Sequence, residues 1–160
     1  MKLIVSIFLL HLLAGFAFGE RTNTGEEKYK PVSKGSLSFK LNGKLYVADS
    51  SHARGYANKQ TMQAYINGAN SADMVMGIEI KKIKGTGTYI INNDDGKVDF
   101  TINHKTFSII KPGDYLKLTI TSVKQQNSFL LLNGMFEAAL QDKLGSKILI
   151  TEGKFETISL

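Results

Sequence analysis

The residues best suited to chemistry stand in one short stretch, Asp49-Ser50-Ser51-His52, which supplies the carboxylate, hydroxyl and imidazole of a hydrolytic triad. A triad converges from separate elements, whereas neighbours in an extended segment point apart. The chain also contains no nucleophile elbow, phosphate-cradling glycine loop or dinucleotide fingerprint. We therefore expect no catalytic residues and a protein that is not an enzyme.

Metal binding is the second chemistry to weigh. A zinc site needs about four Cys, His or carboxylate ligands, and beyond the N-terminal apolar stretch the chain offers only His52 and His104, with no Cys. The acidic turn 92–96 (NNDDG) fails as a helix-flanked calcium loop, because aligning its glycine puts Ile91 and Ile102 at the first and last ligand positions. The sequence predicts no metal and no other cofactor, with a weak calcium contact at this turn as the alternative.

Ligand recognition has a better candidate in residues 49–60 (DSSHARGYANKQ), the least strand-like segment after the predicted leader. Tyrosine and arginine combine contact area with hydrogen-bonding ends, and loops on a rigid scaffold often carry binding residues. We predict a polar loop here, with a ligand-binding role for His52, Arg54, Tyr56 and Lys59. The alternative is a solvated connection without a binding role.

The elements that must position these residues are β-strands, because apolar residues recur with a period of two from Ser36 onward. Leu37, Phe39 and Leu41 alternate with polar residues, and Asn42-Gly43 suits a type I′ hairpin turn. The same alternation continues through most of the chain to residue 155. We predict an all-β fold, a single antiparallel β-sandwich of about eight to nine strands, with a lipocalin-like closed β-barrel as the alternative.

Two features of the last third refine this fold. The run Gly134-Met135-Phe136-Glu137 recurs as Gly153-Lys154-Phe155-Glu156, and a glycine inside an apolar strand indicates a bulge or a close backbone approach. We predict that these runs lie on consecutive antiparallel strands. Residues 136–144 also fit helical spacing before Gly145, but their strand neighbours favour a hairpin that turns at 142–146.

The N-terminus carries the signature of a secretory signal. A positive start precedes an apolar run and the small-residue site Ala17-Phe18-Gly19. The run 3–18 is shorter than the roughly 20 residues of a membrane span. With no Cys to carry a lipid anchor, we expect a periplasmic or extracellular protein whose mature form has no membrane span. The predicted organisation is a signal peptide at 1–19 cleaved after Gly19, a flexible leader at 20–35 and a β-sandwich domain at 36–160.

The charge of the chain argues against nucleic acid as a partner. Removal of residues 1–19 takes away only Lys2, so the net charge falls from +6 to +5. Of the 20 basic residues, 18 are lysines, which are diffuse, well-hydrated charges. Nucleic-acid readers more often interleave arginine clusters with aromatic residues. We interpret the lysines as solvated faces and protected strand edges.

Several short runs resemble a family of small exported β-rich proteins of unknown function from Bacteroidetes. The similar runs are Phe39 to Lys44 (FKLNGK), Gly87-Thr88-Tyr89, Asn133 to Phe136 (NGMF) and Ile150 to Phe155 (ITEGKF). The resemblance covers most of 36–160 and implies a β-rich fold and an exported location, without catalytic residues. This chain lacks the lipid-bearing Cys of the lipoprotein members, and Tyr46 stands where many members have Trp.

Together these features predict a monomeric exported binding module that contacts a glycan, a peptide or an envelope component through residues 49–60 or an adjoining sheet face. Two alternatives stay open. In one, an exposed strand edge pairs with another chain by β-augmentation. In the other, the strands enclose a small apolar ligand.

Overall fold

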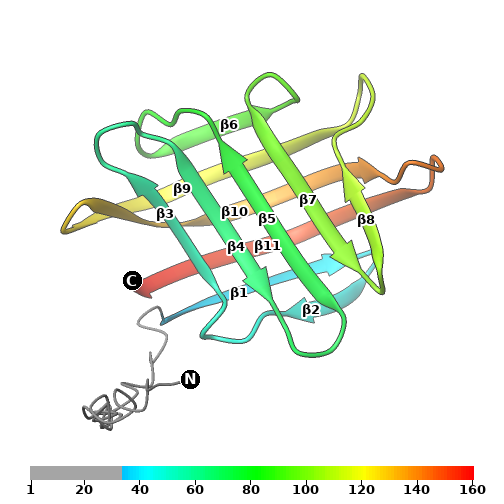
Figure 1. The fold of residues 1–160 in the computed structure, drawn as a ribbon, viewed down its shortest axis with the longest axis horizontal. Helices are drawn as coiled ribbons and strands as arrows, with labels where there is room; N and C mark the ends of the chain where they lie inside the picture. Colours follow the sequence, from blue (N-terminus) through cyan, green and yellow to red (C-terminus); the bar gives the residue numbers. More distant parts are fainter. Residues whose placement is uncertain (1–33) are drawn as a thin grey trace, which may run out of the picture.

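The computed structural model describes residues 34–160, which form eleven β-strands and no helix (Figure 1). This is more than the eight to nine strands expected from the sequence. The predicted signal peptide (1–19) and nearly all of the predicted leader (20–35) lie outside the described residues, and the first strand begins at Lys34. The strands are β1 (Lys34–Leu41), β2 (Lys44–Val47), β3 (Arg54–Asn58), β4 (Ala64–Ala69), β5 (Met74–Ile80), β6 (Gly87–Ile91), β7 (Gly96–Ile102), β8 (Lys105–Ser108), β9 (Tyr115–Gln126), β10 (Phe129–Gln141) and β11 (Lys147–Ser159).

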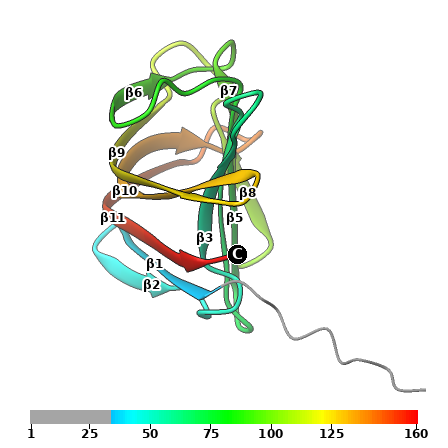
Figure 2. The ribbon, with the colours of Figure 1, turned by 90° about the vertical axis from the view of Figure 1, so that its left-hand side faces the viewer.

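The strands are arranged in two layers with antiparallel pairing throughout, as the sequence predicts for a β-sandwich. The front layer has the order β3-β4-β5-β7-β8, and the rear layer has the order β2-β1-β11-β10-β9-β6. Figure 2 shows the two layers side by side, and Figure 1 shows the front strands crossing the rear strands at a steep angle. Within residues 34–160, no helix has the length and hydropathy that crossing a bilayer would require.

Strand β10 connects the two layers. Along most of its 13 residues it pairs with β9 and β11 in the rear layer. Its first residues also pair with β3, with Phe129 opposite Asn58, and its last residue, Gln141, pairs with Ser108 of β8. Both outer strands of the front layer are therefore hydrogen-bonded to β10.

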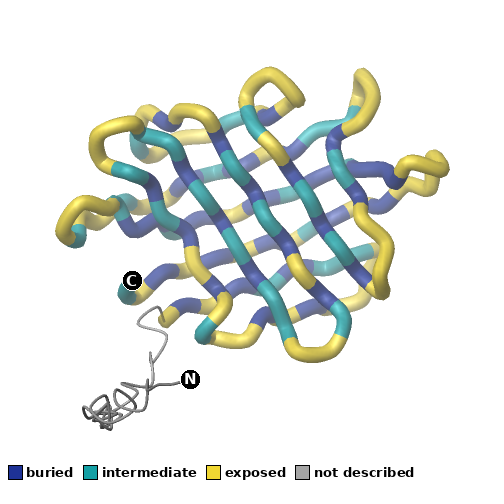
Figure 3. Tube along the Cα trace, viewed as in Figure 1, coloured by how far each residue is buried: buried dark blue, intermediate teal, exposed yellow. Residues whose placement is uncertain are grey.

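The core lies between the layers, and the period-two alternation decides which side chains enter it. Buried and more exposed residues alternate along the strands, as Figure 3 shows. The rings of Phe39, Phe100 and Phe136, from β1, β7 and β10, meet with centroids 5.4–6.1 Å apart. Because these rings come from both layers, they join the two layers within the shared core.

The glycine-phenylalanine runs of the last third lie on consecutive antiparallel strands, as predicted. Gly134 of β10 is opposite Phe155 of β11, and Phe136 is opposite Gly153. The register of this pair shifts just beyond Phe136, and Glu152 adopts a positive φ of 53°. The predicted bulge beside Gly153 is confirmed.

The segment 136–144 forms a strand and a turn, so the preferred hairpin is confirmed and the helical alternative is wrong. Strand β10 continues to Gln141, and the chain then reverses through a turn closed by the Asp142 N–H, which donates to the Ser146 carbonyl at 2.9 Å. Gly145 has a φ of 87°, which a residue without a side chain adopts readily.

Candidate ligand-binding face

The four predicted binding residues are distributed along β3. His52 lies on the turn before this strand, Arg54 and Tyr56 lie within it, and Lys59 follows its end. The prediction of a continuous polar loop over residues 49–60 is therefore wrong. The inward positions of this strand are occupied by Gly55 and Ala57, which are buried but too small to produce a visible apolar alternation in the sequence.

The Asp49-Ser51-His52 stretch does not have the geometry of a triad. The Nδ1 atom of His52 lies 3.3 Å from the Ser51 Oγ and 3.9 Å from an Asp49 carboxylate oxygen. A catalytic histidine contacts the nucleophile and the carboxylate through its two different ring nitrogens. Here both groups lie near the same nitrogen, on a solvent-exposed turn.

The turn at 92–96 is stabilised from within. Its backbone is closed by the Asn92 side chain, which accepts from the Asp94 N–H at 2.8 Å. The Lys81 ammonium donates to the Asp94 carbonyl at 2.6 Å and so occupies an oxygen that a calcium ion would use. Among residues 34–160, no three His, Asp or Glu side chains converge in a way that could hold a metal ion.

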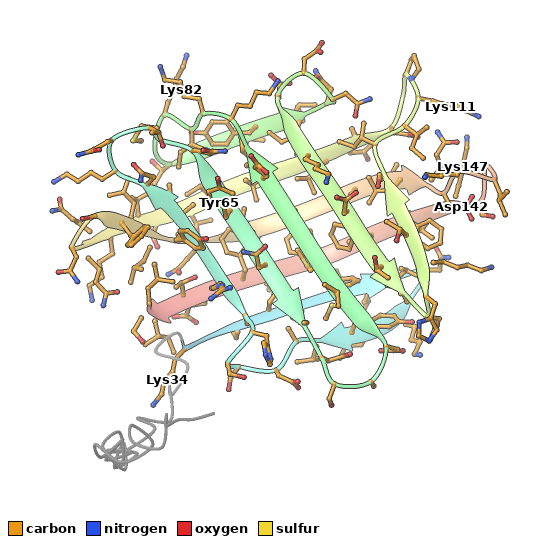
Figure 4. The ribbon with its side chains drawn as sticks, viewed as in Figure 1. Lys34, Tyr65, Lys82, Lys111, Asp142 and Lys147 are labelled. Carbon is orange, nitrogen blue, oxygen red and sulfur yellow. The ribbon has the colours of Figure 1, made fainter. Side chains whose placement is uncertain are left out.

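Tyr56 belongs to an aromatic cluster on the outer face of the front layer. Its ring stacks on Tyr65 of β4, with centroids 5.4 Å apart and planes 26° apart, and Phe129 of β10 meets it edge-on at 5.7 Å. All three side chains retain contact with solvent. Figure 4 shows Tyr65 on the layer that faces the viewer.

This cluster begins a row of side chains that crosses the front layer. In the strand register, Tyr56 is opposite Tyr65, Tyr65 is opposite Glu79 of β5, and Glu79 is opposite Lys97 of β7. We call these four residues the tyrosine row. Directly opposite residues in antiparallel strands share a face of the sheet, so the row combines two aromatic rings with a carboxylate and an ammonium group.

A second row runs beside the first and is polar. Its members, which we call the arginine row, are Arg54, Asn67, Gly77, Asp99 and Ser108. A side-chain carbon added at Gly77 would meet only the Asn67 amide oxygen, at an ordinary contact distance of 3.6 Å. The missing side chain leaves a shallow open depression, whose lining includes Tyr65, Asn67, Gly77, Glu79, Lys97 and Asp99.

The charges on this face are unevenly distributed. The Glu79 carboxylate accepts from the Gln63 amide at 2.6 Å, and Asp99 accepts from the Ser108 hydroxyl at 2.6 Å and pairs with Lys97 at 3.2 Å. Burial, followed by the negative charge of Glu79 and by Tyr56, raises the pKa of the Tyr65 phenol. Arg54 is exposed, and no described side chain forms an ion pair or hydrogen bond with its guanidinium group.

The outer face of the rear layer has a depression of its own, whose lining includes Lys117, Met135, Glu137, Gly153 and Lys154. The Lys117 ammonium lies 2.9 Å from the Glu137 carboxylate, an interaction that raises the pKa of Lys117. At its rim, Lys40 and Glu152 form a second ion pair at 2.8 Å. Most charges of this depression therefore already have protein partners, whereas Arg54 on the front layer has none among the described residues.

Of the predicted residues, the structure brings Arg54 and Tyr56 onto one face and leaves His52 and Lys59 at opposite ends of the strand. It adds Tyr65, Asn67 and Glu79, which alternate with apolar residues in the sequence of β4 and β5 and carry no other signal of a site. Comparisons of the chain with models of known protein families, with curated proteins and with solved structures found no match.

Proposed function

We propose that this protein is an exported, noncatalytic binding protein that holds a glycan on the outer face of its front layer. The observation that carries the proposal is the stacked pair of Tyr56 and Tyr65, 5.4 Å apart, beside a row of hydrogen-bonding side chains. The export part of the proposal rests on the signal peptide predicted at residues 1–19 and on the resemblance to exported β-rich proteins.

The chemistry of the face suits a sugar polymer. A pyranose ring has a face of C–H groups, which packs on an aromatic ring, and a rim of hydroxyls, which need donors and acceptors. Tyrosine supplies both an apolar ring and a polar end. The Asn67 amide and the carboxylates of Glu79 and Asp99 lie one to three strands further along, where neighbouring strands are spaced by about 4.8 Å.

A strand-edge partner is the second candidate. Among the strands of residues 34–160, β2 pairs with β1 alone and is an outer strand of the rear layer. Its residues Leu45 and Val47 are 60% and 54% exposed, and an apolar strand with a free edge is suited to β-augmentation. Mass measurements of the native protein across concentration distinguish this role, because it requires a dimer or a copurifying partner chain.

The glycan proposal is tested by screening the processed protein, purified after expression of the whole chain, against an array of bacterial and plant glycans. We expect Tyr65→Ala to weaken binding to the best array ligand about tenfold, the scale of one lost aromatic contact. The matched control is Val75→Ala, since Val75 is 58% exposed on the same layer but outside both rows. An array without a binder, or a Tyr65→Ala protein with unchanged affinity, would contradict the proposal.

A further inference from the structure

We infer that the glycan held by the front layer is acidic, with a carboxylate that binds to Arg54 while its neighbouring sugar ring packs on Tyr56 and Tyr65. This inference rests on the proposed function and specifies its ligand class.

The first support is the position of Arg54. It lies two residues before Tyr56 on β3, so the two side chains leave the strand on the same face, about 7 Å apart. No described side chain pairs with its guanidinium group. A guanidinium presents a planar set of donors that matches the two oxygens of a carboxylate. Arg54 is therefore available for the bidentate contact that an acidic sugar offers.

The second support is the separation of charge across the face. Asp99, in the same row as Arg54, lies three strands away, which corresponds to about 14 Å. Glu79 lies two strands from β3 in the neighbouring row. The carboxylates of this face are thus on the β5 and β7 side, and Arg54, whose guanidinium has no partner among residues 34–160, is on the β3 side.

Further positive charge lies beyond β3. Leu131 of β10 is opposite Tyr56 on one side and opposite Lys124 of β9 on the other, which extends the tyrosine row to a lysine. Arg54 therefore lies beside Tyr56 along β3, and Lys124 lies beyond Tyr56 across the strands. An acidic sugar placed over the tyrosines meets the positive charges of Arg54 and Lys124 at the β3 end of the face. The next sugar rings of the same glycan meet carboxylates, which accept hydrogen bonds from sugar hydroxyls.

The test compares uronic-acid oligosaccharides with the same oligosaccharides after their carboxyl groups have been reduced to primary alcohols. For the processed whole-chain protein, we expect at least one acidic oligosaccharide to bind about tenfold more tightly than its reduced form. Arg54→Gln should abolish this difference, and Arg54→Lys should restore only part of it, because lysine cannot form the bidentate contact. Lys154→Gln, which removes one positive charge from the rear layer, should leave the difference unchanged.

The outcomes separate this inference from the proposed function. If acidic and reduced oligosaccharides bind equally and Tyr65→Ala weakens both, the acidic class is wrong and the glycan function stands. If Lys154→Gln removes the preference and Arg54→Gln does not, the acidic ligand lies on the rear layer and the inference is overturned. If neither form binds and the array contains no other binder, both the inference and the proposed function fail.

Discussion

At the scale of single residues, two glycines of the rear layer pack tightly against phenylalanine rings. A side-chain carbon added at Gly153 would lie 2.5 Å from the Phe136 carbonyl oxygen and 2.6 Å from its ring. One added at Gly134 would lie 2.9 Å from the Phe155 ring and would also collide with the Thr119 carbonyl. The two repeated runs therefore have a packing function, in which each phenylalanine covers the backbone of the opposite glycine.

This packing predicts that Gly153→Ala destabilises the protein. The added methyl group meets backbone as well as a buried ring, so the strands must move apart, and overpacking of this kind typically costs about 1–3 kcal/mol. Urea denaturation monitored by circular dichroism measures the loss. Gly77→Ala is the matched control, because its new carbon would make only an ordinary contact at 3.6 Å. Equal stability of the two variants would contradict the packing role.

At the scale of strands, the two layers are held together where β3 meets β11. The Gly55 N–H of β3 donates to the Thr157 hydroxyl of β11 at 2.5 Å, and the Thr157 N–H donates to the Asn133 side chain at 2.8 Å. Thr157 is 5% exposed, so water has little access to replace the first bond. One threonine thus connects the front strand that carries Arg54 and Tyr56 to the rear layer.

We expect Thr157→Val to lower the free energy of unfolding by about 1–3 kcal/mol, because valine keeps the shape but leaves the buried Gly55 N–H without an acceptor. Thermal and urea unfolding measure this change. Thr121→Val is the control, since Thr121 is exposed and its hydroxyl bond to the Asn133 carbonyl can be replaced by water. A control that loses as much stability as Thr157→Val would show that the β3–β11 bond has no special role.

Strands with bulky apolar residues at alternate positions, such as Leu37 and Phe39 in β1, could be predicted from the sequence because the pattern identifies the buried face directly. β3 could not, because burial of Gly55 and Ala57 depends on the space left by neighbouring strands. Met62 continues the two-residue apolar spacing of Ala64 and Ile66, yet it precedes β4 and adopts a φ of 59°.

The candidate face shows which site residues can be predicted from residue types alone. Arg54 and Tyr56 could be selected for their chemistry, but their neighbours Tyr65 and Asn67 are brought beside them by the register of β3 and β4. A sequence pattern predicts which residues point outward from a strand. It does not predict which strands pair, since pairing depends on contacts between distant segments, such as β10 with both β3 and β8.

At the scale of the whole molecule, one end of the sandwich is organised by two carboxylates in turns. The Asp114 carboxylate accepts from the Gln141 side chain at 2.5 Å and from the N–H groups of Ile110 and Lys111 at 2.9 and 2.8 Å. Asp142 accepts from the N–H groups of Leu144 and Ser146 at 2.9 and 2.7 Å. Figure 4 shows Lys111, Asp142 and Lys147 gathered at this end.

Both carboxyl groups are more acidic in the folded protein. For Asp114, burial is the largest influence and would raise the pKa, but the hydrogen bonds from Gln141, Lys111 and Ile110, with the charge of Lys147, lower it below its usual value of 3.8. For Asp142, burial is again the largest influence and would raise the pKa, but the hydrogen bonds from Ser146 and Leu144, with the charge of Lys105, lower it.

These shifts predict a loss of stability in acid. A carboxyl whose pKa is lower in the folded state binds protons more readily when unfolded, so its contribution is complete at neutral pH and declines as the pH falls below about 5 towards the folded pKa. Urea denaturation at a series of pH values between 7 and 2 measures the slope. The double variant Asp114→Asn, Asp142→Asn should be less stable at pH 7 and should lose less stability on acidification, because asparagine does not titrate in this range. A double variant whose stability falls with the same slope as the parent protein would place the acid sensitivity in other groups.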